Sequence, residues 1–477
     1  MILTLLIVIP FLGALAVLLP VRAMFRVWFL CAVSLIHAVI ISSFWWQRPV
    51  PEWQGYLVLD SLGLILLSIV SLLFLSVSVF MIGYFQHEHR SNRIFSACLL
   101  ALLSMMTLVA VSYHMGLLWV AIETTTLFSA PLISFHHNWR TLEATWKYLL
   151  VCSVGIALAL MGTFFLAIAA HDVHTLLLPS ILSGASLLSV NWLKLSVIFL
   201  FVGYGCKMGL APMHSWKPEA YGTATGMVVV LMAGGLTQCS FLALMRVSQI
   251  CYKTGLNDFY ASILIVTGVL SLVVPAVLLL SEKSLKRSFA FSSVEHMGLL
   301  VLGLGLGGIG IFGALFHMIN NSLAKVVMFL TAGSVAQKYG SSRTSDVRGV
   351  IHTYPVTGVF LIVGLFAGTG MFPFATFHSE LLIINAAIIS KHYILSGLII
   401  LCLAVIFIGM AKTVLAFVYG QPTEPVLAKK ENFFMNMTIA LAAVALLGLG
   451  LWMPAFLNRV LHEAVTLIGA GSPAWNG

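Results

Sequence analysis

The chain has 477 residues, of which 60% are hydrophobic and only 8% are charged. Because an ordinary globular domain is about 25% charged, this composition excludes a water-soluble protein and requires a bilayer as solvent. The 24 Lys and Arg residues outnumber the 15 Asp and Glu residues. The basic residues concentrate in alternate loops, as the positive-inside rule predicts for a membrane protein, so the positive net charge does not indicate nucleic-acid binding.

Long hydrophobic runs predict an all-α polytopic membrane protein, since a helical span takes roughly 20 residues and satisfies its own backbone hydrogen bonds in lipid. A β-barrel is excluded, because runs such as 57 to 81 and 394 to 417 lack the alternation of barrel strands. About fourteen spans are expected. They cover 2 to 20, 27 to 46, 57 to 84, 94 to 112, 114 to 135, 147 to 170, 192 to 216, 222 to 248, 258 to 281, 287 to 306, 309 to 337, 350 to 389, 393 to 419 and 433 to 456.

The orientation follows from the basic loops. The first run lacks a basic segment before it and predicts a membrane helix, not a cleaved signal peptide. Loops of one parity hold most of the basic residues and are assigned to the cytoplasm, Lys217 and Lys286 among them, whereas Arg246 is assigned to the opposite side. Both termini are then expected on the non-cytoplasmic side of a cell inner (plasma) membrane.

Two of these spans are interrupted by glycines and a proline next to ionisable residues. The seventh is broken at 203 to 215 and the twelfth at 364 to 380. Paired broken helices point to an inverted-repeat transporter with an ion path near the midplane, although Gly and Pro are also simply common in membrane helices. The spacing predicts N-terminal helices in 1–93, two inverted five-helix repeats in 94–248 (helices 4 to 8) and 258–420 (helices 9 to 13), and a C-terminal helix with its tail in 433–477.

Several ionisable residues fall inside the spans, where a charge at the helix centre costs about 3 kcal/mol and marks function by default. Glu123 in the fifth span and Lys207 in the seventh form the natural switchable pair, unless the pair is purely structural. Lys325 and Lys412 lie in later spans, and Glu380 follows the second break. Lys412 is also long enough to snorkel to the membrane surface.

A polar stripe in the eleventh span joins His317, Asn321 and Lys325 at intervals of four, which suits a proton relay or a hydrogen-bonded helix contact. Gln238 is polar at mid-span and can orient water. Glu295 and His296 belong either to the path or to an interfacial ion cluster near Lys286. Three further residues flank the breaks as candidate entry or exit groups, His214, Glu219 and His378.

Cofactor signatures are absent from the sequence. The seven cysteines are scattered singly with no CxxC pair, so neither an iron-sulfur cluster nor a zinc site is expected. No quinone, haem, flavin or metal motif is recognised, so we expect no cofactor in this chain and place any redox cofactor in a partner subunit.

At these residues the chain resembles the antiporter-like proton-channel subunits shared by respiratory complex I, Mrp-type antiporters and membrane-bound hydrogenases, and most of all the F component of hydrogenase 4. The resemblance runs collinearly from about residue 60 to 420. It is carried by WVAIETTTLFSAPLISF at 119–135, TLEATWKYLL at 141–150, GYGCKMGLAPMHSWKPEA at 203–220, KRSFAFSSVEHMGLLVLGLG at 286–305, ALFHMINNSLAKVVMFLTAG at 314–333 and GMFPFATFHSELLI at 370–383.

The resemblance implies a fourteen-helix fold with two inverted repeats, a proton path and membrane partners. Carried over by position, Glu123 is the fifth-helix acid, Lys207 the seventh-helix lysine, His317 and Lys325 the eleventh-helix relay, and Glu380 the exit group. The sequence departs from the family at Gln238, where complex I relatives often carry Lys, at Asn321, often His, and at 221–226, where a proline-containing stretch is usual.

Three functions are therefore open. The first is a proton-translocating subunit of a hydrogenase-4-like or complex-I-like redox complex, bound to other membrane subunits and a cytoplasmic redox arm. The second is a cation/proton antiporter module of Mrp type, which could move sodium. The third is a proton-coupled membrane partner for a docked soluble enzyme, as in inorganic-carbon uptake.

Overall fold

Helices make up the regular secondary structure of the described residues. The computed structural model describes residues 1–86, 91–421 and 430–469, and in these ranges it contains helices and isolated bridges between loops but no strand. Eleven helices there are long and apolar enough to cross a bilayer, and three shorter apolar helices accompany them. The prediction of an all-α polytopic membrane protein is confirmed.

The first half of the chain contributes eleven α-helices and one π-helical turn to the described residues. These are α1 (Ile2–Ala16), α2 (Ala23–Ser43), α3 (Ser61–Tyr84), α4 (Arg93–Val111), α5 (Met115–Ile133), α6 (Trp139–Ala169), α7 (Leu178–Ser183), α8 (Val190–Met208), α9 (Trp216–Thr223), α10 (Gly226–Leu231), the π-helical turn Met232–Leu236 and α11 (Thr237–Thr254). Helix α6 begins earlier than the predicted residue 147, because Asn138 and Thr141 form a capping box at its start.

The second half contributes nine α-helices to the described residues. These are α12 (Asn257–Leu279), α13 (Leu285–Leu306), α14 (Gly308–Tyr339), α15 (Val350–Thr353), α16 (Pro355–Gly368), α17 (Ala375–Ile389), α18 (Tyr393–Tyr419), α19 (Phe433–Leu451) and α20 (Ala455–Ile468). The predicted C-terminal segment thus contains a second, amphipathic helix after its span, and its last residues, 470–477, lie outside the described residues.

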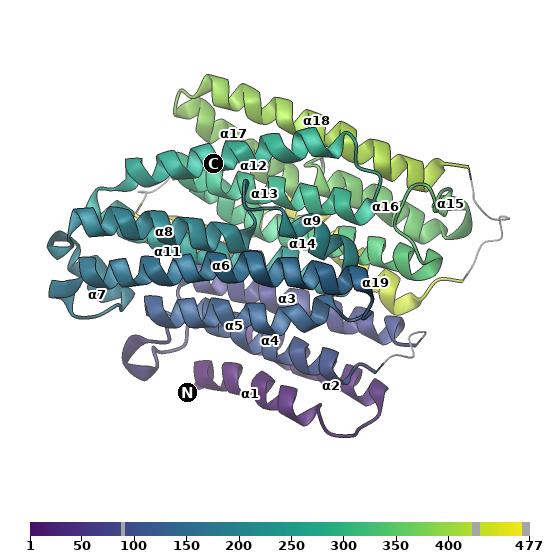
Figure 1. The fold of residues 1–477 in the computed structure, drawn as a ribbon, viewed down its shortest axis with the longest axis horizontal. Coiled ribbons are helices and arrows are strands. Elements are labelled where there is room, and N and C mark those ends of the chain that lie inside the picture. Colours follow the sequence, from purple (N-terminus) through teal and green to yellow (C-terminus); the bar gives the residue numbers. More distant parts are fainter. Residues whose placement is uncertain (87–90, 422–429, 470–477) are drawn as a thin grey trace.

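The long helices lie side by side with nearly parallel axes, from α1 at one edge to α18 at the other (Figure 1). Short α7 lies at one end of the bundle and α15 at the opposite end. Burial separates the helices into an outer and an inner set. In their most hydrophobic stretches, 89% of the residues of α13 and α14 are buried, whereas 39% of those of α6, α12 and α18 are buried. Side chains on α13 and α14 are therefore shielded from lipid.

Both predicted interruptions are present as breaks between half-helices. The first separates α8 from α9 at residues 209–215, and the second separates α16 from α17 at residues 369–374. Each break contains a glycine with positive φ, Gly209 and Gly370, and each contains a cis X-Pro bond, at Pro212 and Pro373. The two breaks share these features as repeats would, and the repeat boundaries remain a prediction.

Candidate functional site: a buried series of ionisable side chains

Lys207 lies at the centre of a first polar cluster, contributed by α5, α6 and α8. Its side chain is fully buried in the last turn of α8, and its ammonium donates to the hydroxyls of Thr126 and, at 3.2 Å, Tyr148. Tyr148 lies 2.6 Å from the Ser129 hydroxyl. Lys207 is thus held by neutral hydroxyl groups.

Glu123 reaches Lys207 through an intermediate and not by direct contact. The Thr126 hydroxyl that receives the Lys207 hydrogen bond lies 3.4 Å from Glu123 Oε2. Glu123 is only partly buried, at the edge of the cluster. The predicted acid and base are therefore neighbours joined by one threonine, and Thr126 and Tyr148 are polar partners that the sequence pattern did not single out.

A second cluster forms where α13, α14 and the second broken helix meet. His296 Nδ1 lies 3.0 Å from His317 Nε2, His296 Nε2 lies 3.1 Å from the carbonyl oxygen of Gly368, and His317 Nδ1 lies 2.9 Å from the Ser379 hydroxyl. Both histidines are fully buried. His296 is therefore a member of the inner cluster and not of an interfacial ion cluster, whereas the ammonium of Lys286 donates to the carbonyl oxygen of Ala224.

The hydrogen-bond partners fix the neutral tautomers of the two rings. A carbonyl oxygen only accepts, so His296 carries its proton on Nε2 and accepts through Nδ1. When both rings are neutral, His317 then donates from Nε2 to His296, and its Nδ1 faces the Ser379 hydroxyl, which also lies 2.9 Å from the carbonyl oxygen of Thr376. The result is a hydrogen-bonded chain that runs from His317 through His296 to the Gly368 carbonyl oxygen, which accepts and cannot donate.

Glu380 is seated against the second break. The side chain is 5% exposed, and a methyl group placed on Gly370 would overlap its carboxylate. Gly370 has a φ of 59°, which L side chains rarely adopt. A glycine at this position therefore serves both the backbone turn and the close approach of the carboxylate.

Lys325 and Glu295 complete the second cluster. Both are fully buried, and among the described residues neither the Lys325 ammonium nor either Glu295 carboxylate oxygen has a hydrogen-bond partner. Lys325 interacts electrostatically with Glu295 and Glu380. Buried polar groups without a protein partner are normally satisfied by ordered water, so this region suits a hydrated path.

Ligand atoms of His296, His317 and Glu380 all lie within 4.8 Å of one another. Two imidazoles and a carboxylate are a donor set that suits a transition metal. The two facing ring nitrogens share a hydrogen bond here, and the positive charge of Lys325 acts on both rings, so the same atoms are arranged to share a proton. The sequence pattern did not anticipate this convergence of donors.

Some of the remaining predicted residues lie inside the bundle and others lie nearer its surface. Gln238 and Asn321 are fully buried, and within the described ranges none of their amide atoms has a partner. His214 is partly buried at the first break. Lys412 is exposed and lies 3.5 Å from the carbonyl oxygen of Leu280, far from a role in either cluster.

Asn320 was missed by the sequence pattern. It is fully buried, and its amide donates to the carbonyl oxygen of Ala375, 2.9 Å away at the start of α17. The regular spacing of four selected its neighbour Asn321 instead. Because α14 is buried on nearly all sides, periodicity does not distinguish one buried face of this helix from another.

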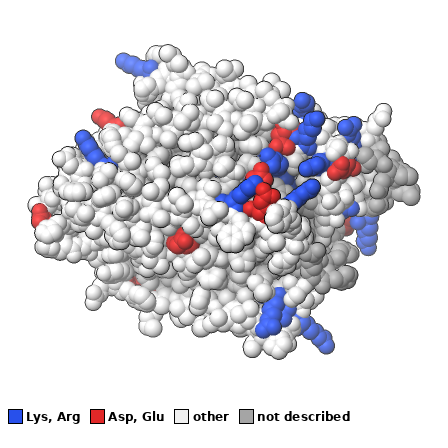
Figure 2. Space-filling model, in the orientation of Figure 1, with Lys and Arg blue, Asp and Glu red and all other residues white. Residues whose placement is uncertain are grey.

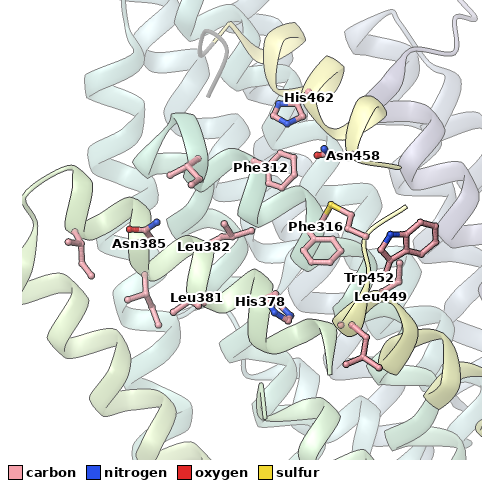
Figure 3. Close-up of a pocket in the computed structure, with 16 residues that line it drawn as sticks. Phe312, Phe316, His378, Leu381, Leu382, Asn385, Leu449, Trp452, Asn458 and His462 are labelled. Atoms are coloured by element: carbon pink, nitrogen blue, oxygen red, sulfur yellow. The ribbon is translucent and has the colours of Figure 1, made fainter. Parts of the chain in front are cut away.

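Two cavities approach this series from opposite ends of the bundle. One of about 700 Å³ is lined by α14, α17, α19 and α20, with His378, Asn458 and His462 as polar members (Figure 3). Another of about 500 Å³ is lined by Pro218 and Glu219 of α9 together with Lys286 and Arg287 of α13. His378 thus lines the first cavity, directly before the Ser379 and Glu380 of the second cluster.

Comparison with known proteins identifies the family. Residues 112–407 match the family model described as NADH:quinone oxidoreductase/Mrp antiporter, TM. The chain belongs to this family. The matched segment holds both helix breaks and both clusters, and it includes the six motifs, from 119–135 to 370–383, that carry the sequence resemblance.

Individual members of the family are similar over most of their length. A hydrogenase-4 component F homolog of Methylacidiphilum infernorum is 29% identical over 410 residues, covering 82% of this chain and 85% of the relative. The F(420)H(2) dehydrogenase subunit N of Methanosarcina mazei is 26% identical, covering 83% and 81%. The putative antiporter subunit mnhD2 of Staphylococcus aureus is 25% identical, covering 86% and 81%.

Solved structures share the fold of this family member. A chain of an archaeal membrane-bound sulfane sulfur reductase superposes with a TM-score of 0.89 at 20% identity, covering 98% of this chain and 97% of that one. A chain of the Mrp complex from Dietzia sp. superposes with a TM-score of 0.87 at 18% identity, covering 99% and 97%. These matches extend the likeness in fold beyond the segment matched by the family model.

Proposed function

We propose that this chain is a proton-translocating membrane subunit of a larger redox complex, and that it assembles with other membrane subunits and a cytoplasmic arm. The observation that carries the proposal is the buried series of ionisable side chains that leads from Lys207 at the first break to Glu380 at the second. Ionisable groups are rare inside membranes and mark proton relays where they recur. The hydrogenase and dehydrogenase relatives support the redox setting.

A proton enters this scheme at the first cluster. When the charge on Glu123 is neutralised or withdrawn, protonated Lys207 loses the attraction transmitted across Thr126 and releases its proton. Water held by Gln238 receives it, since an amide orients water but does not change charge itself. Lys325 is the next buried amine in the series.

The proton leaves through the second cluster. Lys325 gives one proton to the histidine pair, and the pair gives one proton to Glu380 beside the second break. His378 and the cavity shown in Figure 3 then connect Glu380 with the outer side. Each step moves one proton from a donor to an acceptor. A lysine or imidazolium donor becomes neutral, and Glu380 becomes a carboxylate, until the group is protonated again.

The orientation is part of the proposal. We place the α15 end of the bundle in the cytoplasm of a cell inner (plasma) membrane, and both termini on the other side. Lys and Arg gather toward the α15 end on the face drawn in Figure 2, while the broad middle of that face is largely uncharged. A cavity that opens among Lys286, Arg287 and Glu219 would then face the cytoplasm.

Proton uptake into proteoliposomes that contain the purified complex tests the proposal. Lys207→Ala and Glu123→Gln are each expected to abolish uptake, whereas the exposed-site variants Lys391→Ala and Asp172→Asn are expected to transport as the wild type does. Unchanged uptake in both buried-site variants would make the first cluster structural.

Sodium provides the second arm of the same experiment. The relative named as an antiporter subunit and the match to the Mrp complex support cation/proton antiport as the second candidate function. Proton movement that is independent of sodium supports the redox-linked channel. Proton movement that requires a sodium gradient supports the antiporter.

A further inference from the structure

Lys217 is a buried lysine that the scheme above does not use. Its position in the sequence suggests a cytoplasmic loop, but the structure places it in the first turn of α9 with none of its surface exposed. Helix α9 is the second half of the first broken helix and packs against α6 and α13. Lys217 therefore lies inside the bundle and contributes nothing to the charge of the cytoplasmic surface.

The two breaks hold an ionisable residue in the same manner. A methyl group on Gly209 would overlap the Lys217 side chain, just as a methyl group on Gly370 would overlap the Glu380 carboxylate. Gly209 and Gly370 both have positive φ, of 74° and 59°. Each half-helix after a break thus lays one ionisable side chain across the glycine of that break. Lys217 thus lies against the glycine of the first break, as Glu380 lies against the glycine of the second.

The surroundings of Lys217 join the two clusters. Its charge interacts with Cys152 of α6, which also interacts with Lys207, and with Lys325 of α14. On α13 its charge acts on His296, and its ammonium lies 3.4 Å from the carbonyl oxygen of Ser293. No carboxylate of the described residues lies within ion-pair distance of Lys217. Its neighbours are therefore two other bases and neutral groups.

This environment suits a transient proton carrier more than a fixed charge. A permanent buried charge requires a counter-charge, which Lys217 lacks, and two ammonium groups in one apolar region repel each other. Protonation of Lys325 therefore disfavours protonation of Lys217, and the reverse. Two bases that repel each other in this way hold one proton between them. When one base loses its proton to a neighbouring group, the other can be protonated in turn.

We propose that Lys217 is the proton relay between the Lys207 cluster and the Lys325 cluster, fed in addition from the cavity that Pro218 and Glu219 line. In this step the ammonium of Lys207 gives one proton through water to the neutral amine of Lys217, and Lys217 gives one proton through water to the neutral amine of Lys325, which has no direct partner among the described residues. The relay supplies the titratable group that Gln238 does not provide. It rests on the proposed function, because it assigns one step of the same proton path.

Three substitutions at Lys217 distinguish a relay from a structural residue, measured as proton uptake into proteoliposomes with the intact complex. Lys217→Gln removes the titratable group and is expected to slow uptake at least tenfold. Lys217→Arg keeps the charge without releasing a proton and is expected to be equally slow. Lys217→His restores a titratable group and is expected to recover uptake with an optimum at lower pH than the wild type. Lys391→Gln, on the exposed loop after α17, is the matched control.

The outcomes separate this inference from the proposed function. If the wild type transports, Lys207→Ala does not, and Lys217→Gln transports normally, then the relay is overturned while the path stands. If the wild type moves no protons, the proposed function itself fails. Wild-type uptake in Lys217→Arg overturns the relay in favour of a fixed charge. Should Lys217→Arg fail to assemble on size-exclusion chromatography, uptake that Lys217→His restores relative to Lys217→Gln supports the relay, and equal loss in both overturns it.

Discussion

Glu380 illustrates how a single glycine positions a charge. The carboxylate lies against Gly370, and the space there does not admit a methyl group. A residue with a side chain at position 370 must push the carboxylate away from the break and from the histidine pair. A displacement of about 1 Å of a reacting group can slow a reaction about a hundredfold. We therefore expect a side chain at position 370 to reduce the rate of proton transport more than it reduces the stability of the fold.

Gly370→Ala is expected to slow proton uptake by at least about tenfold, because Glu380 moves away from its acceptor and donor groups. The matched control is Gly255→Ala. Gly255 has a φ of 74°, close in strain to that of Gly370, but no atom lies within 4 Å of its added methyl group. Proteoliposome uptake by both variants is compared at equal amounts of folded complex. Equal transport in the two variants would show that the seat of Glu380 is unimportant.

Several residues of the site could be found from the sequence because a charge in a hydrophobic run is conspicuous. Lys207, His317, Lys325 and Glu380 were all expected inside the bundle, and the structure places them there. Lys217 was not predicted inside the bundle, because it follows a proline-containing break, and a basic residue beside a break is typical of a loop. Hydroxyl partners such as Thr126 and Ser379 escaped because Ser and Thr are frequent in membrane helices without a role in transport.

At the scale of elements, the N-terminus of α16 is tied to two other helices by Glu431. This carboxylate accepts hydrogen bonds from the hydroxyl of Thr357 and from the backbone of Val356 at 2.9 Å, and it forms an ion pair with Lys338 of α14 at 3.0 Å. Burial raises the pKa of Glu431, but the hydrogen bonds from Thr357 and Lys338 outweigh it and hold this pKa below its ordinary value. The broken helix is thus anchored at the end away from its break.

Glu431→Gln is expected to lower the free energy of unfolding at pH 7 by about 1 to 2 kcal/mol. A carboxylate with a depressed folded pKa stabilises the protein above the ordinary value of about 4.3, and this stabilisation disappears as the pH falls through the folded pKa. The difference in stability between wild type and variant is therefore expected to be full at pH 7, to shrink as the pH falls below about 4.3, and to vanish below the folded pKa of Glu431. Thermal unfolding in detergent at both pH values measures it, with Asp172→Asn as the surface control. A difference that persists unchanged in acid would contradict the assignment.

The sequence predicted where the helices break but not the π-helical turn at Met232–Leu236, between α10 and α11. The turn leaves the carbonyl oxygen of Gly234 to accept from Ser322 of α14 at 2.8 Å. Hydrophobic periodicity indicates that a helix is present, but it is too coarse to reveal the one additional residue that a π-helical turn contains. Gly234 and Gly235 were visible in the sequence, but two glycines in a membrane helix are too common to carry such a prediction.

For the whole molecule, one buried ion pair joins segments far apart in the chain. Arg246 of α11 donates to both carboxylate oxygens of Asp60, at 2.5 and 2.9 Å, and Asp60 caps the start of α3. The Tyr113 hydroxyl donates to the same carboxylate at 2.9 Å. The sequence analysis counted Arg246 among the charges of the non-cytoplasmic loops and helix ends, but only 1% of it is exposed, so this arginine ties the bundle together instead of marking its surface.

Arg246→Met is expected to destabilise the protein by about 3 to 5 kcal/mol, because it leaves the Asp60 carboxylate buried without its partner. The double variant Asp60→Asn/Arg246→Met is expected to recover part of this loss, since asparagine keeps the acceptor for the Gly63 amide and carries no charge. Unfolding temperatures in detergent test the pair. A double variant no more stable than Arg246→Met would show that the lost packing of the arginine, and not the orphaned charge, is decisive.

Helix α20 is a part of the molecule that a soluble protein outside the cell can reach in the proposed orientation. It lines the larger cavity with Asn458 and His462 (Figure 3), and it is fastened by the Arg48–Glu463 ion pair at 2.9 Å and by the amide of Gln249 at the carbonyl oxygen of Leu467. In the proposed orientation this amphipathic helix lies on the non-cytoplasmic side. A soluble antibody fragment that binds α20 is therefore expected to block the cavity from outside and to inhibit proton flow without crossing the membrane.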